Sequence, residues 1–239
     1  MTRLAIVDDS RLALGPLRQV VETELGWEVA TATCPDEVPA LLEIEDTFDI
    51  AMVDLSYVNS DLNGLDALLT IHDYTPTCRL VVYTQGDPPL AEVLRDAWDA
   101  FELATALSKS TDIPLVLRAL RRVAVEGMAP VDPVLQPLLP AERSRWRSLE
   151  GYGLLVRHAG HAKLWRALIE LDEEPSYRDL AAHTGLSLSA VSNYRSELLT
   201  DLSLHYLDRP RMRQMQRFAK RCRPLLDTHI RRKLGDAVA

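Results

Sequence analysis

A short apolar run, Ile50 to Val53, stands between two carboxylates, Asp49 and Asp54, in the first half of the chain. Stretches with the helical spacing of apolar residues flank it on both sides. An apolar run of this length in this context is typical of a parallel strand that is buried on both faces. Asp54 then stands at the carboxyl end of the strand, the edge at which open α/β sheets bind ligands.

The rest of the first half alternates in the same way between short apolar runs and amphipathic stretches. Besides the run at 49–54, the predicted strands are residues 4–7, 28–32, 80–84 and 103–107. The predicted helices are residues 11–25, 35–45, 65–72, 89–98 and 113–126. This alternation predicts an α/β fold with a doubly wound, five-stranded parallel sheet and helices on both faces.

Charge divides the chain into two halves. Residues 1–140 contain 9 Lys and Arg against 23 Asp and Glu, a net charge of −14, whereas residues 141–239 contain 18 against 12, a net charge of +6. A basic half is expected to face a polyanion. Four prolines at the changeover indicate a stiffened linker: Pro130, Pro133, Pro137 and Pro140. We therefore predict a first domain at 1–127, a linker at 128–145 and a second domain at 146–239.

Composition excludes several classes of protein. The longest apolar runs are far shorter than a membrane span, and the N-terminal residues turn acidic by Asp8 without a signal-peptide pattern. We therefore expect a cytoplasmic protein without a membrane partner. Three scattered cysteines argue against a disulfide framework or a cysteine-based zinc site. The second half has no nucleotide loop, catalytic triad or paired-carboxylate pattern, so we expect no enzyme.

Polar residues gather at the predicted carboxyl ends of the strands. Asp8 and Asp9 end the first strand, Asp54 the third and Thr84 the fourth, and Lys109 follows the fifth. In a parallel sheet these ends share one edge, where three carboxylates would repel one another unless a hard cation such as Mg²⁺ lay between them. An ionised carboxylate is a nucleophile that needs no deprotonation, while a hydroxyl and an ammonium can bind phosphoryl oxygens. The pattern predicts Mg²⁺-dependent acceptance of a phosphoryl group on Asp54.

These positions resemble the receiver domain of two-component response regulators, a flavodoxin-like fold, over residues 1 to about 126. By that resemblance Asp54 is the phosphoacceptor, supplied by a sensor histidine kinase or a small phosphodonor. The resemblance also implies that Asp8, Asp9, Asp54 and the backbone carbonyl of Ser56 bind Mg²⁺, with Thr84 and Lys109 contacting the phosphoryl group. No other cofactor is expected.

The chain departs from the receiver pattern in four places. The loop between Asp54 and Gly64 is about two residues longer than usual, and Gln85 replaces a small residue after Thr84. Ala106 stands where the family has a switch aromatic, and Ser110 replaces a frequent proline. The usual inward swing of an aromatic ring therefore cannot occur at position 106.

The second half contains the pattern of a helix-turn-helix. Ser176 can cap a helix with Asp179 three residues later, Gly185 allows a left-handed turn, and Ser187 or Ser189 can cap the next helix. A small residue at Ala181, Gly185 and an apolar Val191 have the spacing that lets two helices cross closely.

The run from Gly185 to Leu198 resembles the recognition-helix region of LuxR-type output domains. By that resemblance Ser189, Ser192, Asn193 and Arg195 face the major groove, and the amide and guanidinium groups are the best candidates for contacting bases. The chain then continues from Tyr206 to Ala239 with many cations, Arg211 and Arg213 among them. This extension is interpreted either as a helix that contacts DNA phosphates or as a solvated face over a Met and Phe packing stripe.

Together these features predict an all-α DNA-binding domain after the receiver, and hence a transcriptional response regulator. Phosphorylation of Asp54 would alter a surface on the fourth and fifth helices that controls homodimerisation, and the dimer would bind double-stranded DNA. One alternative is a phosphorylation-independent regulator whose receiver is a constitutive dimerisation or ligand-sensing module. Another is an output domain that binds protein or RNA.

Overall fold

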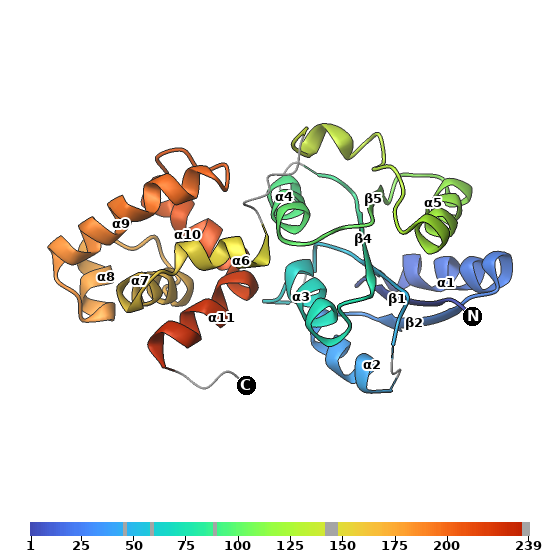
Figure 1. Ribbon diagram of the computed structural model, residues 1–239, viewed down its shortest axis with the longest axis horizontal. Helices are drawn as coiled ribbons and strands as arrows, with labels where there is room; N and C mark the ends of the chain where they lie inside the picture. The colour runs from blue at the N-terminus through green and yellow to red at the C-terminus, as the bar shows by residue number, and fades with distance from the viewer. Residues whose placement is uncertain (45–46, 58–59, 88–89, 142–147, 236–239) are drawn as a thin grey trace. The chain divides into compact units, whose positions relative to one another are not determined.

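Five parallel strands form one sheet in the order β2-β1-β3-β4-β5 (Figure 1). They are β1 (Arg3–Val7), β2 (Glu28–Ala32), β3 (Ile50–Val53), β4 (Arg79–Thr84) and β5 (Thr105–Ser108). All four residues of β3 are buried, as expected for the central strand of a sheet covered on both faces. The predicted doubly wound α/β fold is confirmed.

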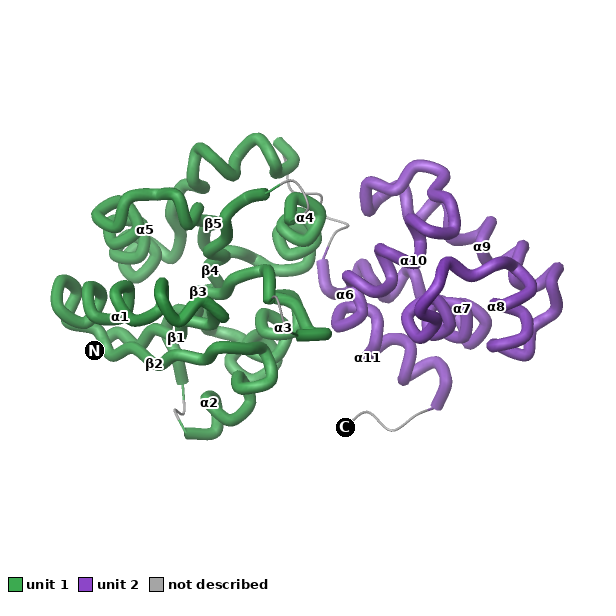
Figure 2. The backbone as a smooth tube through the Cα atoms, turned by 180° about the vertical axis from the view of Figure 1, so that it is seen from behind, with its two compact units in different colours: residues 1–142 green, residues 143–239 purple. Residues whose placement is uncertain are grey.

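The structure, a computed structural model, describes residues 1–44, 47–57, 60–87, 90–141 and 148–235. The chain forms two units, residues 1–142 with the sheet and residues 143–239 with helices alone (Figure 2). Residues 142–145 of the predicted linker lie outside the described residues, as do 146 and 147. Within the described ranges, no helix combines the length and the apolar character needed to cross a membrane.

Helices cover both faces of the sheet, with α1 and α5 on one side and α2, α3 and α4 on the other (Figure 1). Their bounds are α1 (Arg11–Leu25), α2 (Val38–Ile44) after a 3-10 turn at Pro35–Glu37, α3 (Gly64–Tyr74), α4 (Ala91–Ala100) and α5 (Ile113–Glu126). Helices α1 and α5 end at Gly26 and Gly127, which adopt the left-handed conformation that favours glycine. Both helices therefore have the bounds that the sequence predicts.

Residues 129–139 are here called the edge segment, and its first residues, 129–132, run beside the outer strand β5. Ala129 N donates to Ala104 O at 3.0 Å, and Asp132 N donates to Ala106 O at 2.9 Å. These bonds cover backbone groups that an outer strand would otherwise expose. The first part of the stretch interpreted as a linker is therefore hydrogen-bonded to the first unit, because the backbone of residues 129–132 bonds to the outer strand.

The edge segment also contacts α4 and the loop before it. Arg95 Nε, on α4, donates to Leu138 O at 2.8 Å, and Leu135 is fully buried. Gly86 lies so close to Leu135 that a Cβ at position 86 would be 2.5 Å from the Leu135 Cδ2 atom. The surface next to α4 in this chain therefore includes the edge segment, a feature that the helical pattern did not predict.

The second unit packs around α7. Its helices are α6 (Leu149–Tyr152), α7 (Ala159–Glu170), α8 (Tyr177–Thr184), α9 (Leu188–Ser203), α10 (Met212–Arg221) and α11 (Arg223–Leu234). Helix α7 contacts α8, α9, α10 and α11. Its Trp165 is fully buried and its indole Nε1 donates to Leu155 O at 2.7 Å, so the ring packs without leaving its N–H unpaired.

The C-terminal extension forms two helices, α10 and α11, and not one continuous helix. The break falls at Cys222, two residues before Pro224, because a proline is tolerated in the first turn of a helix and not in its interior. Met215 and Phe218 are fully buried, so the extension does contain a Met and Phe packing stripe. The cations lie on the other side, with Arg213 and Arg217 exposed.

Candidate functional site

The carboxylates that follow β1 and β3 meet at one edge of the sheet. The two strands are neighbours in register, with Val7 opposite Val53, so Asp8 and Asp54 leave the sheet side by side. Carboxylate oxygens of Asp8, Asp9 and Asp54 all lie within 4.8 Å of one another. Asp8 is 2% exposed and Asp54 6% exposed, so water screens little of their repulsion.

Lys109 lies between two of these carboxylates. Its Nζ is 2.7 Å from Asp8 Oδ2 and 2.8 Å from Asp54 Oδ2. Burial raises the pKa of Asp54, while the hydrogen bond and charge of Lys109 act in the opposite direction. Burial acts to lower the pKa of Lys109, but its bonds to Asp54 and Asp8 outweigh burial and raise it. The lysine therefore stays charged and holds the two acids together.

Thr84 ends β4 at the same edge. Its side chain is fully buried, and its Oγ1 has no hydrogen-bond partner among the described residues. The backbone N of Lys109 donates to Thr84 O at 2.9 Å, which places the hydroxyl and the ammonium on adjacent loops. An unpaired buried hydroxyl costs free energy, so this one is available to a ligand that enters the site.

The donor set fits a small hard cation. Three clustered carboxylates carry the charge and the oxygen ligands that Mg²⁺ prefers, and water and phosphate oxygens ordinarily complete its coordination. Ser56 lies half-buried two residues after Asp54, and its carbonyl stays a predicted ligand. Asp8, Asp9, Asp54, Thr84 and Lys109 are thus brought to one edge, while their roles remain predictions.

The loop after β3 is held by two residues whose importance the sequence did not indicate. Tyr57 is buried, and its hydroxyl donates to Val7 O at 3.1 Å, which ties the loop to the end of β1. Burial and the nearby charge of Asp54 raise the pKa of Tyr57, so its hydroxyl keeps its proton. At Gly64 the chain folds back so closely that a Cβ would lie 2.3 Å from Asp54 O.

Gly64→Ala is expected to destabilise the fold by about 1–3 kcal/mol, because the new methyl group would force the backbone around Asp54 to move. Urea unfolding followed by circular dichroism measures the change. Gly15→Ala is the matched control, since apart from the adjacent residues and the backbone of α1 no described atom lies within 4 Å of the Cβ position at Gly15. Equal urea midpoints for the two variants would contradict the close approach of Gly64 to the Asp54 carbonyl oxygen.

Two of the departures from the receiver pattern lie close to the site. Gln85 is exposed, and Ala106 is fully buried with its carbonyl bonded to Asp132 N. Tyr83 belongs to the core, with its ring centroid 5.9 Å from Lys109 Nζ. The backbone of Ala106 is thus bonded to the edge segment.

The second unit contains the predicted helix-turn-helix in α8, Gly185 and α9. Ser176 caps α8 through a capping box with Asp179, and Gly185 has a φ of 70° in the turn. Ser187 caps α9, since its Oγ accepts a hydrogen bond from Ala190 N. Ser189, Ser192 and Asn193 are exposed along the first turns of α9, whereas Val191 is buried.

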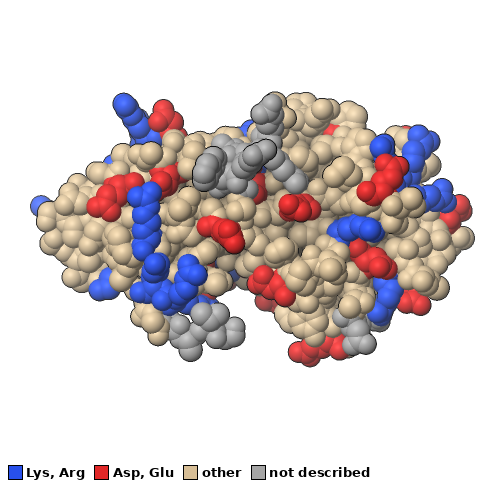
Figure 3. Space-filling model, viewed as in Figure 1, with Lys and Arg blue, Asp and Glu red and all other residues tan. Residues whose placement is uncertain are grey.

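The three predicted arginine contacts differ in their surroundings. Arg195 is half-buried and its Nη2 donates to Pro210 O at 2.6 Å, so this guanidinium helps to hold the chain between α9 and α10. Arg211 starts α10, and Arg213 is exposed. Figure 3 shows Lys and Arg side chains gathered over the C-terminal half of α11, whose last turn contains Arg231, Arg232 and Lys233.

One solved structure is similar to nearly the whole chain. RcsB from Salmonella enterica serovar Typhimurium, bound to promoter rprA in the presence of the phosphomimetic BeF3−, is 13% identical to this chain with a TM-score of 0.52. The match covers 92% of this chain and 98% of RcsB. The chain therefore has the fold of a receiver sheet followed by a helix-turn-helix unit.

Other matches cover a little more than half of the chain. A LuxR-family two-component response regulator from Aurantimonas sp. SI85-9A1 is 21% identical, with a TM-score of 0.49 over 57% of this chain and 94% of its own. A LuxR-family DNA-binding response regulator from Silicibacter pomeroyi is also 21% identical, with a TM-score of 0.45 over 56% of this chain and 99% of its own. No protein-family model and no curated protein matches the sequence.

Proposed function

We propose that this chain is a transcriptional response regulator whose first unit accepts a phosphoryl group on Asp54. The observation that carries the proposal is the set of groups at one sheet edge. Asp54 contacts Lys109, lies beside Asp8 and Asp9, and shares the edge with the Thr84 hydroxyl, which has no hydrogen-bond partner in the described parts of the chain. Strained or unpaired buried groups at a sheet's carboxyl edge are expected where a ligand binds.

The chain's own residues account for the transfer. A carboxylate oxygen of Asp54 attacks the phosphorus of the donor, and the donor leaves with the electrons of the bond that breaks. Lys109 can move from the carboxylates to one phosphoryl oxygen, while Thr84 donates its hydroxyl to another. Mg²⁺ held by Asp8, Asp9 and Asp54 would neutralise charge as the group is transferred.

Incubation with a small phosphodonor and Mg²⁺, followed by intact-protein mass spectrometry, tests the proposal. A gain of one phosphoryl mass that EDTA prevents is the expected outcome. No gain with either a small phosphodonor or a panel of histidine kinases would instead favour the phosphorylation-independent regulator. Analytical ultracentrifugation before and after phosphorylation then measures the proposed shift from monomer to homodimer.

The second unit is proposed to bind double-stranded DNA through α9. Support comes from the capped helix-turn-helix with Ser189, Ser192 and Asn193 exposed at the start of α9, and from the net charge of +6 over residues 141–239. Arg195, Arg211 and Arg213 are the proposed cationic contacts. RcsB, which has the same fold, was captured on a promoter. Selection of bound duplexes from random DNA tests this, and enrichment of RNA or protein in place of DNA would refute it.

Asn193→Ala is expected to weaken binding to the selected duplex by about 1–3 kcal/mol, because an exposed amide there can make a bidentate contact with adenine. Fluorescence anisotropy with the selected and a scrambled duplex measures the loss. Thr200→Ala is the matched control, since position 200 lies seven residues further along α9 and is also exposed. If the two variants lose affinity equally, Asn193 does not read a base.

A further inference from the structure

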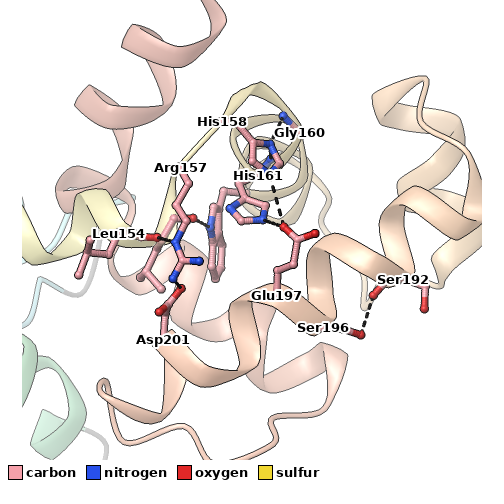
Figure 4. A network of polar contacts seen from close by, with 11 residues as sticks. Leu154, Arg157, His158, Gly160, His161, Ser192, Ser196, Glu197 and Asp201 are labelled. Atoms are coloured by element: carbon pink, nitrogen blue, oxygen red, sulfur yellow. Dashed lines mark hydrogen bonds and ion pairs between the residues drawn. The ribbon is translucent and has the colours of Figure 1, made fainter.

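Three side chains of types that can bind a metal ion converge where α7 meets α9 in the second unit (Figure 4). They are His158 and His161 at the start of α7 and Glu197 on α9, and their potential ligand atoms all lie within 4.8 Å of one another. None of the three is among the residues proposed to contact DNA. Two imidazoles and a carboxylate are a donor set suited to a transition-metal ion.

The local backbone fixes which atoms face the centre of the cluster. His158 is the N-cap of α7, and its Nδ1 accepts from Gly160 N at 3.1 Å and from His161 N at 3.4 Å. Its Nε2 therefore remains for a ligand and lies 3.5 Å from Glu197 Oε2. Because the cap holds the ring by one nitrogen, the direction of the other is set before any ion binds.

His161 is held even more firmly. Its side chain is fully buried, and its Nε2 lies 3.0 Å from the same Oε2 atom of Glu197. The Tyr194 ring packs over both imidazoles, with centroid separations of 4.9 Å to His158 and 5.6 Å to His161. Gly160 permits this packing, since a Cβ there would be 2.3 Å from the tyrosine ring. One wall of the cluster is thus aromatic, while Glu197 stays open to solvent.

The distances match those between ligands on one small ion. Ligand atoms about 2.0–2.1 Å from a tetrahedral Zn²⁺ ion are about 3.3 Å from each other. The separations of 3.0 and 3.5 Å between the imidazole Nε2 atoms and Glu197 bracket that value. We propose that His158, His161 and Glu197 bind one Zn²⁺ ion, with water or an exogenous ligand in the fourth position.

Such an ion would tie the start of α7 to the middle of α9. Arg157 and Asp201 already form an ion pair one helical turn further along α9, so the two ties would act on the same side of the helix (Figure 4). Any effect on DNA rests on the proposed function, because it requires α9 to be the recognition helix. Zn²⁺ binding itself rests only on the three side chains.

Isothermal titration of the full-length protein with ZnCl2 in excess Mg²⁺ tests the site, because Mg²⁺ is expected to saturate the acidic edge of the first unit. The variants are His158→Asn, which keeps the N-cap, and Glu197→Gln, which keeps the shape. Losing even an outer partner of a metal ligand weakens binding about 10–100-fold, so each variant should raise the Kd for Zn²⁺ at least that much.

His183→Asn and Glu170→Gln are the matched controls. His183 Nε2 and Glu170 Oε2 form a similar pair at 2.8 Å, and the pair belongs to no three-residue metal cluster among the described residues. One Zn²⁺ per chain with an unchanged Kd in both controls, and in Asp54→Asn, is the expected result. Binding that survives His158→Asn and Glu197→Gln, or no binding to the native protein, overturns the proposal.

Zn²⁺ binding and DNA binding are read separately, so the two proposals can fail independently. Saturating Zn²⁺ is expected to raise the melting temperature of the native chain and leave that of Glu197→Gln unchanged. Failure to select any duplex would refute the proposed role of α9 in DNA binding, and it would not affect the evidence for Zn²⁺ binding. Equal shifts in the native chain and Glu197→Gln would remove the Zn²⁺ site alone.

Discussion

Asp54→Asn will take up no phosphoryl group from a small phosphodonor in Mg²⁺, whereas the native chain will gain one. The amide cannot replace the carboxylate, because it is neither charged nor able to attack phosphorus as an anionic oxygen does. Asp54 is the one proposed acceptor, so the loss is expected to be complete. Intact-protein mass spectrometry gives the readout.

Asp49→Asn is the control for this loss. Asp49 flanks the same strand at the opposite edge of the sheet, where its carboxylate accepts a hydrogen bond from Arg3 N at 2.8 Å. This variant should accept a phosphoryl group as the native chain does. Phosphorylation of Asp54→Asn to the native extent would place the acceptor elsewhere and end the proposal for this edge.

The second large effect is expected from Lys109→Met. Removing the ammonium leaves Asp8 and Asp54 facing each other without a cation, in a site where both are buried. Breaking a buried ion pair on one side costs about 3–5 kcal/mol, so the free energy of unfolding at neutral pH should fall by about that amount. Denaturant unfolding in EDTA measures it.

Mg²⁺ distinguishes repulsion between the acids from a simple loss of packing. If the carboxylates bind the ion, adding Mg²⁺ should recover part of the lost stability in Lys109→Met, since the ion replaces the missing positive charge. Lys163→Met, at an exposed position on α7, should leave the stability nearly unchanged. A Lys109→Met variant as stable as Lys163→Met would show that Lys109 does not hold the acids together.

Several features of both units follow from local patterns. The apolar run of β3, the glycines after α1 and α5, and the caps of α8 and α9 are properties of a few adjacent residues. Parallel strands then bring their carboxyl ends to one edge. The meeting of Asp8, Asp54, Thr84 and Lys109 could therefore be predicted without any knowledge of their contacts.

Contacts between residues distant in the chain were not accessible in this way. Proline composition indicated a linker at 128–145, yet residues 129–132 bond to the outer strand β5, because an outer strand offers hydrogen bonds to an extended segment that reaches it. Arg195 has a side chain that can contact a base, and the sequence did not indicate that its guanidinium also donates to Pro210 O. The residue type sets the contacts that a side chain can make, and the neighbouring residues decide which of those contacts form.

The chain's local order thus specified the sheet, most helices and the residues of the acidic edge, since backbone propensity and burial act over a few positions. Tertiary packing alone placed the Tyr57 hydroxyl on Val7 O and brought His161 within reach of Glu197, 36 residues later. Those arrangements depend on how whole elements pack against one another, and no periodicity along a single segment encodes that packing.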